Sequence, residues 1–191
     1  MESSREILSQ AFPFLASQDL DLLLEGSKLL HLEHKETISK EGDRIAHIHY
    51  IHKGMVRGYF IADTGEERTM IIRPTNTFSG PPGILSGATH SKYNFEAIQE
   101  TVLIRMDINS ILSYSNTHLG ICRLYNEILR ENLHTVFFRV ELLAGMSPEE
   151  RYETLLKERP ELFQKSYHKY VANYLGITPN SLSRIIKRRK G

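Results

Sequence analysis

The chain has 191 residues, of which 40% are apolar and 25% are charged, and its formal net charge is +1. This is ordinary globular composition, so an intrinsically disordered chain is excluded and a sizeable core can form. The single cysteine, Cys122, excludes an internal disulfide and an all-cysteine metal site within one chain. Because we find neither a membrane-length apolar stretch nor a signal peptide, we expect a cytoplasmic protein without membrane contacts.

The charge is unevenly distributed along the chain. Residues 1–146 hold 14 Lys and Arg against 18 Asp and Glu, which gives −4, whereas residues 147–191 hold 10 against 5, which gives +5. From residue 165 onwards there are seven basic residues and no acidic one. This pattern is typical of a surface that binds a polyanion, although a solvated basic tail has the same composition.

The first predicted elements are two short helices, over residues 6–15 and 20–28. From residue 29 to residue 106 the pattern changes to short alternating apolar runs, separated by turn residues such as Lys53-Gly54. Short strands at this spacing predict an antiparallel sandwich or barrel.

A long helix is predicted next, from Ile108 to Leu143, with Asp107 as its N-cap. Five of its apolar residues are spaced by 4, 3, 4 and 3 positions, which is the pattern of a helix that packs against a partner helix. The partner is either the β-domain or a second copy of the chain, and the length of the helix favours the copy. The predicted dimer interface is Leu129, Leu133, Val136, Val140 and Leu143.

A new helix is predicted to begin after Ser147. The run Ser147-Pro148-Glu149-Glu150 combines an N-cap serine, a proline at the first helical position and a glutamate three residues after the cap. This helix should end near Pro160, and a domain boundary precedes it.

Residues 167–189 carry the most informative pattern. One apolar helical face ends at Gly176, Ile177 fills the turn, and Thr178-Pro179 begins a second helix. The second helix has a buried apolar face and an outer face of amide, hydroxyl and basic side chains, which is what reading the major groove of DNA requires. An ordinary helical hairpin with a solvated face is the alternative. The outer residues are Asn180, Ser181, Ser183, Arg184, Lys187 and Arg188.

The whole chain resembles the Crp/Fnr (catabolite activator and fumarate-nitrate regulator) superfamily. The resemblance is most specific in Lys40-Glu41-Gly42-Asp43, in the strand at residues 50–57 and in residues 170–185. It implies an α+β fold: an N-terminal antiparallel β-roll of the cyclic-nucleotide-binding type (a double-stranded β-helix), a long dimerisation helix and a C-terminal helix-turn-helix. The implied domains are a sensor at 1–106, a connecting helix at 107–146 and a DNA-binding domain at 147–191.

The resemblance also implies roles for residues of the last helix. Asn180, Ser181 and Arg184 would face base edges, whereas Thr178, Ser183 and Lys187 would lie nearer to phosphates, with Arg188 beside them. The implied partners are double-stranded DNA with an approximately palindromic operator, a second copy of the chain and, as a further candidate, RNA polymerase. The sequence ends directly after this helix, so we expect no strands to follow it here.

The effector site departs from the family pattern. Family members that bind cyclic nucleotides use a glutamate and an arginine, and the best alignment places Pro81 and Ser91 at these positions. Lys92 should point to the opposite face from Ser91. We therefore expect an unknown small-molecule effector other than cyclic AMP or cyclic GMP, or no effector. The predicted pocket residues are Phe78, Ser79, Gly80, Gly83, Ile84, Leu85, Ser91 and Lys92.

No catalytic motif, cofactor site or metal site is predicted. The cluster of His47, His49 and His52 lacks the carboxylate that cupin-like metal sites place four or five residues further on. The alternative function is a β-barrel protein that binds a small molecule, or a cupin-like enzyme, with a basic helical tail.

Overall fold

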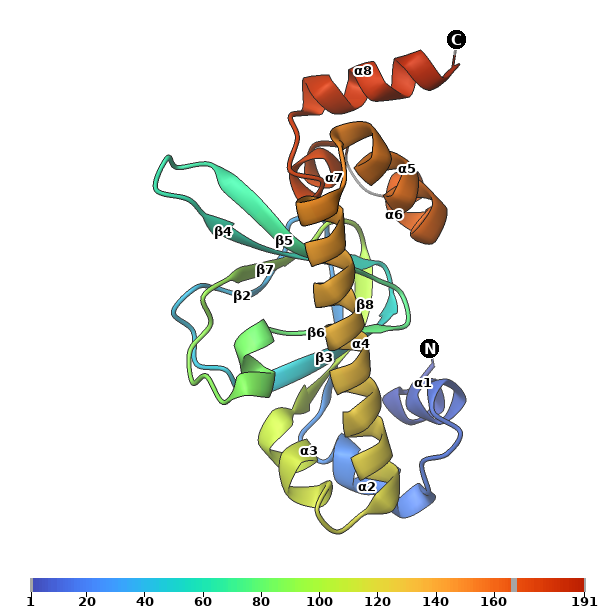
Figure 1. Ribbon diagram of the computed structural model, residues 1–191. Helices are drawn as coiled ribbons and strands as arrows, with labels where there is room; N and C mark the ends of the chain where they lie inside the picture. Colours follow the sequence, from blue (N-terminus) through green and yellow to red (C-terminus); the bar gives the residue numbers. More distant parts are fainter. Residues whose placement is uncertain (1, 166–167, 191) are drawn as a thin grey trace.

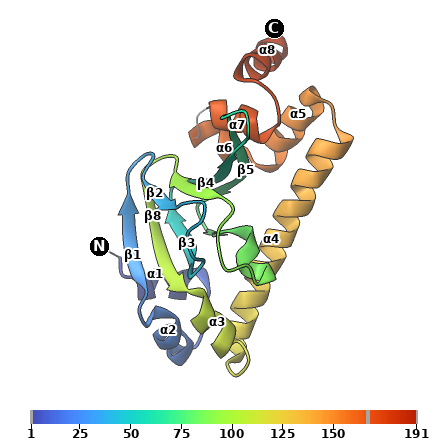
Figure 2. The same cartoon turned by 90° about the vertical axis from the view of Figure 1, so that its left-hand side faces the viewer.

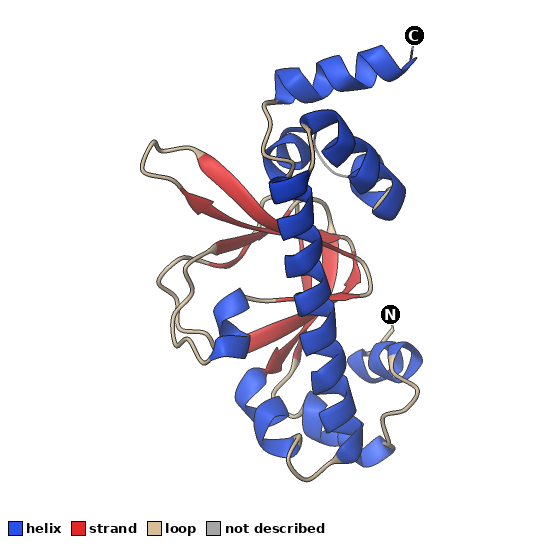
Figure 3. Ribbon diagram, in the orientation of Figure 1, coloured by secondary structure: helices blue, strands red, loops and turns tan. Residues whose placement is uncertain are grey.

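The computed structural model describes residues 2–165 and 168–190. Position 167, where the predicted helix-turn-helix pattern begins, lies outside the described residues. A β-roll lies beside one long helix, and the C-terminal helices lie at one end of both (Figures 1 and 3). None of the described helices is long and apolar enough to cross a membrane.

The β-roll consists of two four-stranded antiparallel sheets, as the strand spacing predicted. The first has the order β1 (Lys28–Leu32), β8 (Thr101–Asp107), β3 (His47–Lys53) and β6 (Thr77–Ser79). The second has the order β2 (Thr37–Ser39), β7 (Asn94–Ala97), β4 (Met55–Ile61) and β5 (Glu67–Pro74).

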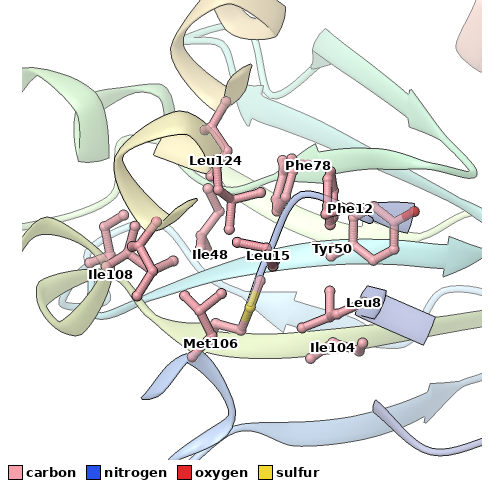
Figure 4. Close-up of a cluster of buried hydrophobic side chains, with 14 of the residues drawn as sticks. Leu8, Phe12, Leu15, Ile48, Tyr50, Phe78, Ile104, Met106, Ile108 and Leu124 are labelled. Atoms are coloured by element: carbon pink, nitrogen blue, oxygen red, sulfur yellow. The ribbon is translucent and has the colours of Figure 1, made fainter. Parts of the chain in front are cut away.

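The two faces of the first sheet belong to different cores. Ile48, Tyr50 and Met106 point outward and form one apolar cluster with residues of helices α1 (Ser4–Ala11) and α2 (Ser17–Leu24). Figure 4 shows these three side chains in the cluster that contains Leu8 of α1. The alternate residues Ile51 and Leu103 point into the roll, toward the second sheet. The outer core is completed by the two helices that follow β8, namely α3 (Ile108–Tyr114) and α4 (Leu119–Gly145).

The predicted single helix over residues 108–143 is wrong, because it is broken into α3 (Ile108–Tyr114) and α4 (Leu119–Gly145). At the break, the side chains of Ser115 and Asn116 both donate hydrogen bonds to the carbonyl of Leu112, at 2.8 Å and 3.1 Å. Short polar side chains that bond to the backbone in this way compete with continued helical bonding. Asp107 does cap α3, since its carboxylate accepts from the backbone N–H groups of the first turn.

The C-terminal helices are α5 (Pro148–Glu158), α6 (Glu161–Lys165), α7 (His168–Tyr174) and α8 (Pro179–Lys190). Ser147 and Glu150 form the predicted capping box at the start of α5. Among the residues that the structure describes, these helices do not form a separate core. Their apolar cluster continues into Leu142 of α4 and into Met55 and Ile72 of the roll.

Candidate nucleic-acid interface and its connection to the β-roll

Helix α8 has one apolar face and one basic face. Leu182 and Ile185 are buried against the other C-terminal helices, and Ile186 is half-buried on the same side. The opposite face is exposed and contains no carboxylate. The predicted DNA-binding residues that are exposed on it are Thr178, Asn180, Ser183, Arg184, Lys187 and Arg188.

The start of α8 is fixed by Thr178 and Ser181. The Thr178 hydroxyl accepts a hydrogen bond from the backbone N–H of Ser181 at 3.1 Å, and the two hydroxyl oxygens lie 3.0 Å apart. Thr178 is therefore the N-cap, as predicted. Because Ser181 is half-buried with its hydroxyl at the cap, it is less available for a base contact than Asn180.

The two arginines of the exposed face differ in their surroundings. Arg188 Nη1 lies 3.3 Å from Glu149 Oε1 of α5, and both side chains are more than half exposed. Exposed ion pairs contribute roughly 0–1 kcal/mol, so Arg188 can exchange this carboxylate for a phosphate. Arg184 makes no ion pair within residues 2–165 and 168–190 and is free to meet a ligand.

Helix α7 holds α8 in place and is itself fixed to strand β4 by Arg57. The guanidinium carbon of Arg57 lies 4.0 Å from the ring centroids of both Tyr59 and Tyr170. Its nitrogens donate hydrogen bonds to Glu96 at 2.7 Å and Glu67 at 2.6 Å. Burial disfavours the charge, but these hydrogen bonds outweigh it and raise the pKa of Arg57. The buried cation thus stays charged and joins α7 to the roll.

A second connection joins α7 to β5, the edge strand of its sheet. Asn173 Nδ2 donates to the carbonyl of Glu67 at 2.8 Å, and Asn173 Oδ1 accepts from the backbone N–H of Thr69. The amide side chain pairs with this edge as a neighbouring strand would. Arg139 of α4 completes the junction by donating to the carbonyls of Tyr174 at 2.6 Å and Thr69 at 3.1 Å.

A third connection joins β5 to α4 through Arg73, whose side chain is 2% exposed. It donates to Glu131 at 2.9 Å, Thr135 at 2.8 Å and Asn132 at 2.7 Å. Burial lowers the pKa of Arg73 and raises the pKa of Glu131, and the attraction between the two charges opposes both shifts. Glu131 also accepts from the N–H of Phe78 at 3.3 Å, which brings β6 into the same network.

Four of the five residues predicted for the dimer interface project from α4 into solvent, with exposed fractions between 37% and 57%. Phe137 lies beside them and is 58% exposed. The 4, 3, 4, 3 spacing of apolar residues did not include it, because it directly follows Val136. A continuous apolar stripe of this kind is typical of a protein interface. The exposed four are Leu133, Val136, Val140 and Leu143, and Leu129 is half-buried.

The predicted pocket residues do not surround one cavity. Phe78, Ile84 and Leu85 pack in the outer core, on the side of the first sheet that faces the helices. Phe78 lies opposite Tyr50 in the β3–β6 register, with ring centroids 5.3 Å apart, so it points away from the roll interior. The face of the sheet to which Phe78 points depends on the register of β6 against β3, and this register could not be derived from the sequence.

Of the remaining predicted pocket residues, Gly83 lies in the 3-10 helix η1 (Pro82–Ser86) and the others lie before or after it. Ser91 is buried and its hydroxyl donates to the carbonyl of Tyr93 at 2.7 Å, whereas Lys92 is exposed. Ser79 is buried, and Gly80 and Gly83 are half-buried.

An apolar cavity lies between α4 and the roll, where Figure 2 shows the helix running along the side of the sheets. Its volume is about 530 Å³. It includes Val136, Val140 and Leu143 of the stripe, together with Met70, Ile71 and Tyr93 of the roll.

Comparison with known proteins supports this architecture. Residues 29–118 match the model of the cyclic nucleotide-binding domain family. A sequence comparison with curated proteins gave no significant match.

Several solved structures share the fold. FixK2 from Bradyrhizobium japonicum has a TM-score of 0.73 at 17% identity, covering 85% of this chain and 83% of its own. A transcriptional regulator of the crp/fnr family from Eubacterium rectale has a TM-score of 0.69 at 17% identity, covering 95% of this chain and 88% of its own. The c-di-GMP-responsive global regulator CLP from Xanthomonas campestris has a TM-score of 0.69 at 16% identity, covering 92% of each chain.

Proposed function

The chain has the fold of the Crp/Fnr family of transcriptional regulators, and from this premise we propose that it regulates transcription by binding specific DNA sequences. The observation that carries the proposal is the exposed face of α8, which is basic and free of carboxylates, while the apolar face of the same helix packs with α7. A helix of this kind fits the major groove of B-DNA.

We assign different tasks to the residues of this face. Asn180 and Arg184 can make bidentate contacts with adenine and guanine edges, respectively. Lys187 and Arg188 would neutralise phosphates, which gives affinity without sequence preference. Thr178, Ser181 and Ser183 would lie at the start of the helix, where backbone N–H groups also favour a phosphate.

The regulator acts as a homodimer in this proposal, paired along the exposed stripe of α4. A two-fold axis along this helix would bury the stripe and close the mouth of the 530 Å³ cavity, since the two share three residues. Two recognition helices would then meet major grooves about 34 Å apart, which calls for an approximately palindromic operator. RNA polymerase is the further protein partner that such a role implies.

We infer that cyclic nucleotides are not the effector. The roll interior is closely packed around Phe95, which is buried and lies within 2.7 Å of where a Cβ on Gly58 would be. Pro81 and Ser91 provide neither the carboxylate nor the cation that such a ligand needs. An effector, if the protein has one, is an apolar or weakly polar molecule in the cavity beside α4.

The direct test is selection of bound duplexes from a random DNA pool, followed by binding measurements over a salt series. We expect an approximate palindrome to be enriched and its affinity to fall steeply with salt. The absence of any enriched sequence, with no binding to duplex DNA at low salt, would exclude the proposal in favour of a small-molecule-binding protein with a basic tail.

A further inference from the structure

The interior face of the first sheet carries a polar row next to an apolar one. Ser79 of β6, His49 of β3 and Arg105 of β8 lie directly opposite one another in the strand register. The next row on the same face contains Ile51 and Leu103, which belong to the apolar core of the roll. Polar groups inside a protein cost free energy unless they are hydrogen-bonded, so this row calls for polar contacts.

Two atoms of the row lack such contacts within the described chain: Ser79 Oγ and Arg105 Nε are buried and have no hydrogen-bond partner there. The other interior arginines differ in this respect. Arg57 and Arg73 are paired with carboxylates, and Arg139 donates to two backbone carbonyls. Because a buried N–H group needs an acceptor, Nε of the half-buried Arg105 indicates an acceptor that comes from outside the described chain.

His49 and Arg105 of this row line a cavity of about 70 Å³ in the roll, and this cavity shares no lining residue with the larger one beside α4. A water molecule occupies about 30 Å³ in the liquid, so the cavity has room for a small ion and not for a nucleotide. One carboxylate lines it, and this group already accepts a backbone hydrogen bond at 2.7 Å. The charged and titratable lining groups are Asp43, Arg44, His47, His49 and Arg105.

We propose that this cavity binds a small oxyanion, namely a carboxylate, nitrate or phosphate ion, with Arg105 and Arg44 as its cations and His47 beside it. A guanidinium group suits a small oxyanion because its N–H groups form charge-assisted hydrogen bonds with the oxygen atoms of such a ligand. The site does not depend on DNA binding and goes beyond the proposed function.

Binding at this site is linked to pH through His47. Burial and the nearby Arg105 lower the pKa of His47, while Asp107 acts in the opposite direction. A bound anion would offset the charge of Arg105, so anion binding and protonation of His47 favour each other. His49, with a pKa lowered to about 4 mainly by burial, stays neutral. Affinity should therefore rise as the pH falls through the pKa of His47.

The test is an NMR titration of the full chain, read from the imidazole signals of His47 and His49. The probes are sodium acetate, sodium nitrate and inorganic phosphate, with ionic strength held constant by chloride. We expect at least one probe to give saturable shifts at millimolar concentration, with tighter binding near pH 5.5 than near pH 7.5, which brackets ordinary histidine titration. Acetate tests for a carboxylate, nitrate for a planar ion with three oxygens, and phosphate for a tetrahedral ion.

Two variants make the test specific. Arg105→Gln removes the half-buried cation and should weaken binding about tenfold or more, the loss typical of a charge-assisted hydrogen bond. Arg68→Gln makes the same change of charge at an exposed arginine outside the cavity and should leave the affinity unchanged.

Shifts that fail to saturate with all three probes, or equal affinity in Arg105→Gln and the unaltered protein, would mean that the cavity holds only water and would overturn the proposal. If Arg105→Gln does not fold, His47→Gln decides instead. It should bind without the pH dependence, and a pH dependence that persists in it would also count against the site.

Discussion

Arg184 and Lys187 occupy the same exposed face of α8, about one turn apart, yet we expect different results from removing them. Arg184→Ala should cost about 1–3 kcal/mol at the selected half-site and relax base choice there. Lys187→Ala should weaken all sequences alike and lower the salt slope by about one unit. Fluorescence anisotropy with selected and random duplexes separates the two. An equal loss on both duplexes for Arg184→Ala would refute its base-reading role.

Gly58 is required by close packing inside the roll. A Cβ at this position would lie 2.7 Å from Phe95 Cε1 and 2.9 Å from Cζ, and the buried ring has little room to move. We expect Gly58→Ala to lower the free energy of unfolding by about 1–3 kcal/mol, the usual cost of overpacking a core.

Gly145→Ala is the matched control for this change, because the added methyl group would have no described atom within 4 Å beyond its chain neighbours and the backbone of its own helix. It should leave the free energy of unfolding in urea unchanged or slightly increased. If both alanine variants unfold at the same urea concentration, the packing argument for Gly58 does not hold.

The junction between α7 and β5 depends on one amide side chain. Asn173→Ala removes both hydrogen bonds to β5 and leaves the N–H of Thr69, a residue that is 1% exposed, without its acceptor. Stability should fall by about 1–3 kcal/mol, the penalty for an unpaired buried polar group. Asn109→Ala, at an exposed asparagine of α3, should stay within about 0.5 kcal/mol. Urea denaturation measures both, and equal values would argue against the junction.

The stripe on α4 can be tested with a single charge. Val136→Glu places a carboxylate in the middle of the proposed interface, where burying it without a partner is costly. Sedimentation should find the unaltered protein dimeric and this variant monomeric at micromolar concentration. Ile61→Glu, at another apolar residue that is 57% exposed but lies on β4, should remain dimeric. A monomeric unaltered protein would refute the interface.

Local signals predicted the elements better than the contacts between them. The capping box at Ser147, the N-cap at Thr178 and the turn at Gly176, with φ +70°, depend on neighbouring residues and were all predicted. The break at residues 115–118 was missed, because apolar spacing continues across it and masks the polar side chains that end α3.

Contacts between distant strands could not be derived from the sequence. The polar row of Ser79, His49 and Arg105 depends on the register of three strands that are far apart in the chain. The aligned anchor positions contained no cation, which argued against a cyclic nucleotide, but they gave no sign of the arginine on β8. The connection of Arg57 to Tyr170 was equally invisible, since 113 positions separate the two residues.

At the scale of the whole molecule, His49 couples folding to pH. Burial, aided by His47 and Arg105 and opposed by a hydrogen bond to the Ser79 backbone, lowers its pKa from 6.5 to about 4. Between these values the unfolded chain binds a proton that the folded chain does not, so the free energy of unfolding falls as the pH drops through this window. The full shift corresponds to about 3 kcal/mol.

His49→Gln should therefore flatten the decline in stability between about pH 6.5 and about pH 4, while the loss from carboxylate protonation at lower pH remains. Urea denaturation at stepped pH gives both slopes. His47, whose pKa is also lowered, should leave a smaller residual slope in the variant. An unchanged slope would show that His49 is protonated without cost in the folded protein.

Hydrogen exchange at the Thr69 amide, which is hydrogen-bonded to Asn173, reports on the separation of α7 from the roll. This amide proton is held by a side chain of α7 and not by a neighbouring strand, since β5 lies at the edge of its sheet. It can exchange with solvent deuterium only when α7 separates from the roll, whereas the amides paired with β4 need the sheet itself to open. The ratio of these exchange rates therefore measures the free energy of undocking the C-terminal helices, and any ligand that changes this ratio acts on the junction.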